Sequence, residues 1–256
     1  MKKKLLFAAL IVVASTCSAY SQAGGSAAPA AADANTSSII TAVLKDAYGA
    51  NFDTKRSCWA YTEKDDSGDV GYCMQPGTSE VINTQGGKQL YLTANSFVGP
   101  SDDGKYIYDH TQPGLMGVFQ VKLDGKGGWS YVVAKKDLEY GTAGVCGCDK
   151  AKLIKLNAKG DYGWLFSNGG MWQGTIVSTY SIVVAINGAY QDISSLPEIT
   201  EKDQNTEYDL KFIDLPTRDK FYPIKVTAKN RKSGAVVRDY LVHYDAKTQM
   251  YALPGK

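Results

Sequence analysis

The chain has 256 residues and a formal net charge of +2, from 28 Lys and Arg against 26 Asp and Glu. Lysines are spread among acidic residues along most of the chain, whereas attraction to nucleic acid needs a clustered basic surface, so the charge pattern argues against nucleic-acid partners. The length beyond the first forty residues suits one β domain or two smaller ones, and it suffices for a core that does not depend on disulfides.

The amino-terminal segment has the order of a secretory signal: lysines at positions 2–4, an apolar run over residues 5–14, then small residues. The apolar run has about ten residues, and a membrane-spanning helix needs about 20. We therefore expect a signal peptide at 1–23, no transmembrane segment in the mature chain, and a periplasmic or secreted protein of bacterial type. Removing three lysines leaves 25 basic and 26 acidic residues, a charge of −1. A lipid-modified Cys17 is the alternative, although Thr16 fits a lipoprotein signal poorly.

Residues 24–36 are small and mostly uncharged, so they predict a flexible linker that cannot offset its ordering entropy by burial. A helix is expected next, with Thr36 or Ser37 as its cap and Gly49 at its end. Its apolar residues recur at helical spacing and form one stripe: Ile39, Ile40, Val43, Leu44 and Ala47. Such a stripe either recruits a partner helix or packs on a neighbouring sheet, and we favour packing.

Short runs rich in Tyr, Val, Trp and Thr follow the helix and predict strands. They lie at 58–63, 71–75, 80–84, 89–94, 115–123 and 129–135. Acidic turns at 65–69 and 101–105 lack the spacing of a calcium loop, so we interpret them as solvated turns.

The second half continues in the same manner, with expected strands at 152–157 and 175–186. The stretch 182–186 is apolar at nearly every position, which predicts a central strand covered on both faces. A closing meander is expected from strands at 208–213, 224–228, 236–244 and 249–253.

The sequence thus predicts a mainly β protein of antiparallel sheets, arranged as a sandwich or meander, with one short amino-terminal helix after the signal peptide. We expect a β-rich domain over 37–200 that includes the helix. The meander over 201–256 is either a separate unit or part of the same domain.

Four cysteines remain after removal of the signal, and an even number in an exported chain favours disulfides. We expect Cys58 to pair with Cys73 across a short hairpin-like segment, which leaves Cys146 and Cys148 to close a small ring. A structural clip is favoured over a redox pair for this C-x-C sequence, because thiol catalysts usually carry C-x-x-C at a helix start. The spacing does not fit a zinc site.

Residues that could carry catalysis are few. The chain has two histidines, His110 in a turn-rich loop and His243 in an expected strand, and no G-x-S-x-G elbow. Paired carboxylates could hydrolyse a glycan, but nothing singles out a pair, and Asp161, Asp192 and Glu198 are guesses. No cofactor and no metal are predicted.

The most concentrated candidate for binding is the stretch 162–173, which we interpret as a loop between strands. Flat rings and amide groups there could contact a sugar face or a partner protein. The candidate ligand-binding residues are Tyr162, Trp164, Asn168, Trp172, Gln173 and His110. The favoured alternative for Trp164 and Trp172 is that both rings pack in the core.

The leading hypothesis is a non-enzymatic periplasmic or secreted protein that binds a protein or an envelope glycan through its loops. A narrower version is an inhibitor or immunity protein against an enzyme that attacks the envelope. The competing hypotheses are an envelope glycan hydrolase with unrecognised carboxylates and a structural subunit of a surface assembly.

Overall fold

The computed structural model describes residues 34–65, 68–97, 105–215 and 219–254, which belong to one compact unit. The expected signal peptide, Cys17 and residues 24–33 of the expected linker lie outside the described residues. Within the described ranges, no helix is both long and apolar enough to cross a membrane.

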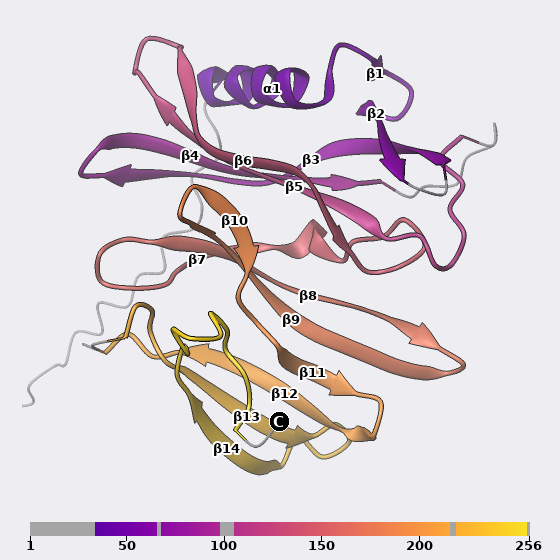
Figure 1. The fold of residues 1–256 in the computed structure, drawn as a ribbon, viewed down its shortest axis with the longest axis vertical. Coiled ribbons are helices and arrows are strands. Elements are labelled where there is room, and N and C mark those ends of the chain that lie inside the picture. The colour runs from indigo at the N-terminus through magenta and orange to yellow at the C-terminus, as the bar shows by residue number, and fades with distance from the viewer. Residues whose placement is uncertain (1–33, 66–67, 98–104, 216–218, 255–256) are drawn as a thin grey trace, which may run out of the picture. The chain divides into compact units, whose positions relative to one another are not determined.

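The one α-helix among the described residues, α1 (Ala34–Tyr48), lies on one face of the first sheet (Figure 1). Its apolar stripe is buried with that sheet's residues in one core, so the prediction that it packs on a sheet is confirmed. The helix begins earlier than expected, with Thr36 and Ser37 inside its first turn, so the predicted cap is wrong. Gly49 ends it as expected, since its φ is +90° and its N–H donates to the Lys45 carbonyl at 2.9 Å.

The first sheet is an antiparallel meander whose six strands neighbour one another in chain order. The strands are β1 (Phe52–Asp53), β2 (Cys58–Asp65), β3 (Gly68–Thr84), β4 (Gly87–Ser96), β5 (Gly114–Leu123) and β6 (Trp129–Tyr140). The two strands expected at 71–75 and 80–84 are one strand, β3. A bulge between Pro76 and Ser79 carries the pairing past the proline.

The second sheet begins after a short 3₁₀ turn, η1 (Cys148–Lys150). Its strands are β7 (Lys152–Lys155), β8 (Tyr162–Trp172), β9 (Thr175–Ile186), β10 (Ala189–Asp192), β11 (Leu196–Thr200), β12 (Asp203–Phe212), β13 (Ile224–Asn230) and β14 (Val236–Val242). The order is β14-β13-β12-β11-β9-β8-β7, and β10 also pairs with β9. The expected strand at 249–253 is absent from the described residues. That segment makes isolated bridges, Asp245 with Met250 and Ser194 with Tyr251.

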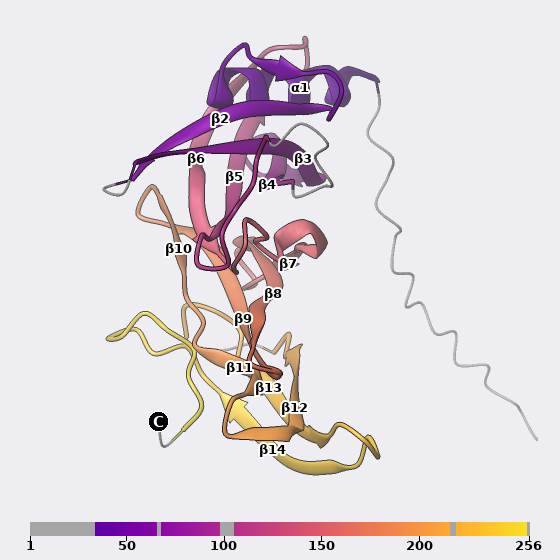
Figure 2. The ribbon, with the colours of Figure 1, turned by 90° about the vertical axis from the view of Figure 1, so that its right-hand side faces the viewer.

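The mainly β, antiparallel class is therefore confirmed, and residues beyond 200 continue the sheet that starts at β7. The two sheets meet at a shared core that contains Met116 and Val118 from β5 and Trp164 and Phe166 from β8. Figure 2 shows β10 beside β6, where the Tyr140 hydroxyl donates to the Asp192 carboxylate at 3.3 Å.

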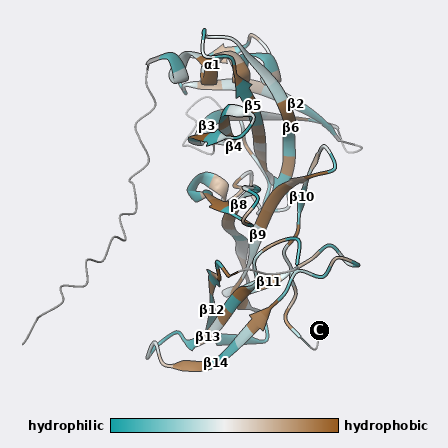
Figure 3. Cartoon of the chain, turned by 90° about the vertical axis from the view of Figure 1, so that its left-hand side faces the viewer, coloured by the Kyte–Doolittle hydropathy of each residue, from teal (hydrophilic) through white to brown (hydrophobic). Residues whose placement is uncertain are grey.

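Strand β9 supplies residues to the cores on both of its faces. Ile182, Val184 and Ile186 enter the core formed with β13 and the carboxyl-terminal segments, and Val183 enters the core between the sheets. The hydrophobic colour of β9 follows this burial (Figure 3). The predicted central strand covered on both faces is confirmed.

Both expected disulfides are present. Cys58–Cys73 joins β2 to β3, and Cys146–Cys148 closes the turn before η1. All four cysteines are buried, and the second pair lies in the core between the sheets.

The two disulfides are expected to differ in their contribution to stability. Cys58 and Cys73 are 15 residues apart, and Cys146 and Cys148 are two apart. Because loop-closure entropy grows with loop length, the Cys58→Ala/Cys73→Ala variant should lose about 3 kcal/mol of unfolding free energy and the Cys146→Ala/Cys148→Ala variant about 1.5 kcal/mol. Denaturant unfolding measures both. A larger loss for the second pair would contradict this ranking.

Alkaline pH is expected to destabilise the protein through its buried tyrosines. Burial raises the pKa of Tyr91 to about 12, with smaller contributions from Tyr162 and Asp161, and burial also raises the pKa of Tyr190 above its usual value. An unfolded tyrosine ionises near pH 10. The stabilising contribution is therefore complete below about pH 10 and is lost as pH rises toward and beyond 12. Unfolding free energies measured across this range should fall, and less steeply for Tyr91→Phe; a flat profile would contradict the expectation.

Candidate functional site

The stretch 162–173 is not the loop that the sequence suggested. Residues 162–172 form β8, which pairs with β9 in a long hairpin. The turn is Gln173-Gly174, with φ of +48° and +82°, between the paired residues Trp172 and Thr175. Two positive φ values are characteristic of the type I′ turn that suits tight hairpins. The glycines at 169 and 170 therefore lie within a strand.

The far half of this hairpin extends beyond its neighbouring strands. β7 pairs with β8 only over residues 162–165, and β11 reaches β9 only as far as Ser178. Within the described part of the chain, residues 170–177 pair in β-ladders only with each other, and Gly169 pairs with Ser178. Met171 is 70% exposed there, and Figure 1 shows the hairpin end projecting past β7 and β11.

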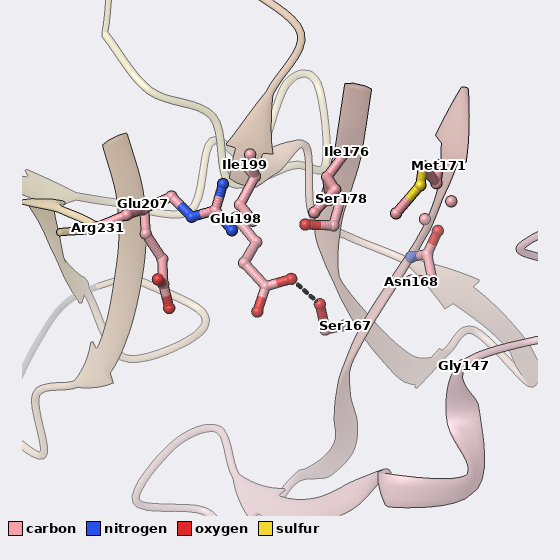
Figure 4. A pocket seen from close by; sticks show the side chains of 12 residues that line it. Gly147, Ser167, Asn168, Met171, Ile176, Ser178, Glu198, Ile199, Glu207 and Arg231 are labelled. Atoms are coloured by element: carbon pink, nitrogen blue, oxygen red, sulfur yellow. Dashed lines mark hydrogen bonds between the residues drawn. The ribbon is translucent and has the colours of Figure 1, made fainter. Parts of the chain in front are cut away.

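An open groove of about 540 Å³ lies beside this half of the hairpin (Figure 4). Its charged side chains are Glu198 from β11, Glu207 from β12 and Arg231 after β13, opposite the polar and apolar residues of β8. The Ser167 hydroxyl donates to the Glu198 carboxylate. The groove therefore combines two carboxylates, a guanidinium and apolar surface within reach of one extended ligand.

The Gln204 side chain fixes the hairpin beside the turn that joins β11 to β12. Its Oε1 accepts the Ile176 N–H at 3.1 Å, and its Nε2 donates to the carbonyls of Ile176 at 2.7 Å and Thr200 at 2.6 Å. It occupies backbone groups of β9 at a point where no strand pairs with them on that side. No local pattern in the sequence distinguishes this glutamine from other turn residues.

The candidate residues of β8 do not converge on one site. Trp164 is fully buried in the core between the sheets, whereas Asn168 lines the groove and donates from Nδ2 to Ser181 Oγ at 2.6 Å. Gln173 is exposed at the turn. Tyr162 lies at the opposite end of the strand, about 30 Å from the tip at the usual rise per residue.

The two histidines lie outside the groove. His110 is exposed in the segment before β5. His243 was expected in a strand, but β14 ends at Val242 and His243 is exposed just after it. Its Nδ1 lies 2.7 Å from an Asp219 carboxylate oxygen.

The structure separates the three guessed acids. An Asp161 oxygen accepts from Asn157 Nδ2 at 2.7 Å, and Asp192 Oδ1 accepts two backbone N–H groups, from Ile182 at 3.1 Å and Ser194 at 3.0 Å. These two acids organise turns, and Glu198 alone of the three lines the groove. Among the described residues, no group of three or more His, Cys, Asp or Glu side chains is placed to hold a metal ion.

Comparison with known proteins finds no match to a family model, to a curated protein or to a solved structure. The interpretation of the groove and hairpin therefore depends on their geometry and chemistry.

Substitutions of buried and exposed residues of the hairpin should have different effects on the unfolding free energy. Trp164→Ala removes a fully buried ring and should lower the unfolding free energy by about 3–5 kcal/mol. Met171→Ala, at an exposed position, should change it by no more than about 0.5 kcal/mol. Denaturant unfolding of both variants checks this contrast, and comparable losses would show that the hairpin end is part of the packed core.

Proposed function

We propose that this is an exported, non-enzymatic binding protein that recognises a protein partner with the free end of the β8–β9 hairpin and the adjoining groove. The observation that carries the proposal is the projecting segment 169–177, which has no strand neighbours outside its own hairpin among the described residues.

The chemistry of this segment supports recognition. Exposed strand edges are ready to pair with another chain, and most proteins protect them with charged residues or proline. The sequence 169–177 contains no charged residue and no proline, and Met171 is largely exposed. Methionine adapts its shape to varied apolar surfaces. Gln204 occupies the backbone groups of Ile176 on the β9 side, so the edge offered to a partner is that of β8. An apolar edge without charge or proline is typical of a surface that a partner covers.

The groove adds specificity to this edge. Glu198, Glu207 and Arg231 present both signs of charge beside the apolar hairpin, and such an arrangement selects partners by charge complementarity. A hairpin that projects free of its sheet can also enter a concave surface on its partner, as long antibody loops do. Inhibition of an envelope-attacking enzyme is therefore the narrower form of the proposal.

The two disulfides support an oxidising compartment, since such bonds persist in secreted and periplasmic proteins and are rare in the cytosol. Export by a removed signal peptide, and a periplasmic or secreted location, complete the proposal.

The test is capture of a partner from envelope extract on the immobilised mature protein, followed by titration with the purified partner. Met171→Asp should weaken the affinity at least about tenfold, because Met171 is largely exposed on the hairpin. Trp172→Ala tests the candidate that the sequence suggests at the same end of β8, where the structure describes the backbone of Trp172 and not its side chain, and we expect a similar loss. Val237→Asp is the matched control, because Val237 is 64% exposed on β14, on a different part of the second sheet.

Unchanged affinity for both hairpin variants, with folded spectra, would remove the hairpin from the binding surface. Equal weakening by Val237→Asp would show that the effect is not specific to the hairpin.

A further inference from the structure

We propose that a second, smaller pocket, where the two sheets meet, binds a single neutral saccharide unit. The pocket measures about 210 Å³ and takes its lining from both sheets: Gln89 and Tyr91 on β4, Gln120 on β5, and Asp161 and Tyr162 at the start of β8. Small-molecule sites form preferentially at such junctions between packed units. This inference is independent of the hairpin and of the groove.

The wall from the first sheet is a network of amide and phenol groups. Gln120 Nε2 donates to Gln89 Oε1 at 2.7 Å and to the Tyr91 hydroxyl at 3.1 Å, and that hydroxyl donates to Gln89 Oε1 at 3.3 Å. Among the described residues, these bonds leave the Gln89 NH₂ donors and the Gln120 carbonyl oxygen unused. The network is therefore held in place and still presents a donor and an acceptor.

The opposite wall supplies a ring and a carboxylate. Tyr162 is partly exposed, and its ring centroid lies 5.5 Å from that of Tyr91. One Asp161 oxygen accepts from Asn157, which leaves the second oxygen free to accept from a ligand. A flat aromatic face beside amide and carboxylate groups matches the apolar face and the paired hydroxyls of a sugar ring.

The hydroxyl of Tyr190, a residue of the core between the sheets, lacks a partner among the described residues. Tyr190 is 9% exposed, and its hydroxyl makes no hydrogen bond within the described part of the chain. Tyr190 stands opposite Ala185, a lining residue of the pocket, and Tyr91 adds to the rise in the pKa of Tyr190 that burial mainly causes. Buried hydroxyls rarely remain unpaired. A hydroxyl-bearing ligand at the Tyr91 end of the pocket would bring a polar group close to it.

The charge and size of the pocket favour a neutral sugar over other small ligands. No Lys, Arg or His lines it among the described residues, and Asp161 opposes an anion. The volume of about 210 Å³ suits a ligand of about one ring.

The experiment uses the full mature chain and three probes added separately: glucose, galactose and N-acetylglucosamine. Saturation-transfer NMR detects binding, and ¹⁵N side-chain amide signals of Gln89 and Gln120 report its location. We expect at least one probe to bind and to shift these two amides. Glucose 6-phosphate should bind at least several-fold more weakly than glucose, because its charge faces Asp161.

Variants locate the site independently. Gln120→Glu replaces the donor of the network by an acceptor, and Tyr162→Ala removes the ring; each should weaken binding about tenfold or more. Tyr162→Phe keeps the ring and should bind better than Tyr162→Ala. Gln173→Asn, at the exposed hairpin turn, is the matched control and should bind as the unaltered protein does.

If no saturation is transferred from the protein to any of the three sugars at concentrations well above millimolar, the proposal is overturned. An affinity for the sugar that is unchanged in both the Gln120→Glu and the Tyr162→Ala variants would overturn it as well. If Gln120→Glu fails to fold, Tyr162→Ala at the pocket's edge decides alone. These outcomes do not test the hairpin proposal, because the hairpin variants are measured by their affinity for the protein partner.

Discussion

The structure depends on one strand that is apolar on both faces. From Ile182 to Ile186, β9 gives alternate side chains to two separate cores, so the strand must have packed layers on either side. One layer is the first sheet, and the other is built from β13 and the segments after β12 and β14. The amino-terminal half of the same strand leaves both cores and forms one arm of the projecting hairpin. The buried half therefore anchors the exposed half.

The turn that contains the second disulfide lies between the two sheets. A side chain at Gly114, the first residue of β5, would place its Cβ 2.2 Å from the Cys146 backbone nitrogen. On the other side, a Cβ at Gly147 would lie 2.8 Å from the Ser167 carbonyl oxygen on β8. Glycine is required at both positions because backbone approaches backbone at these points. The turn thus links the register of β5 to that of β8.

Much of the fold can be predicted from the sequence because short local patterns determine the type of each element. The alternation over 208–213, the continuous apolar run at 182–186 and the close spacing of Cys58 and Cys73 each reflect a nearby physical cause. Short β10 and β11 were missed, since β11 contains Pro197 and has only five residues. The sequence predicts a loop in place of β8 because Gly169 and Gly170 are typical of turns.

The candidate sites were harder to predict because their parts come from distant segments. Asn168 and Tyr162 were recognised from the composition of one stretch, but they line different pockets. Glu207 and Arg231 join the groove through the pairing of β12 with β13. The side chains of Gln89 and Gln120 meet because β4 pairs with β5, where Gln89 faces Lys122 and Gln120 faces Tyr91. No single window of sequence contains these relations.

The placement of the cysteines has a consequence for biosynthesis. Each disulfide joins residues of one short segment, so its oxidation requires only a local closure, which is entropically the least demanding kind. In a chain exported from its amino terminus, as we propose, the first bond can form before the first sheet is complete, and the second before the strands of the second sheet have followed. Late isomerisation of wrongly paired cysteines is then unnecessary, and the nascent protein should depend little on a disulfide-shuffling catalyst.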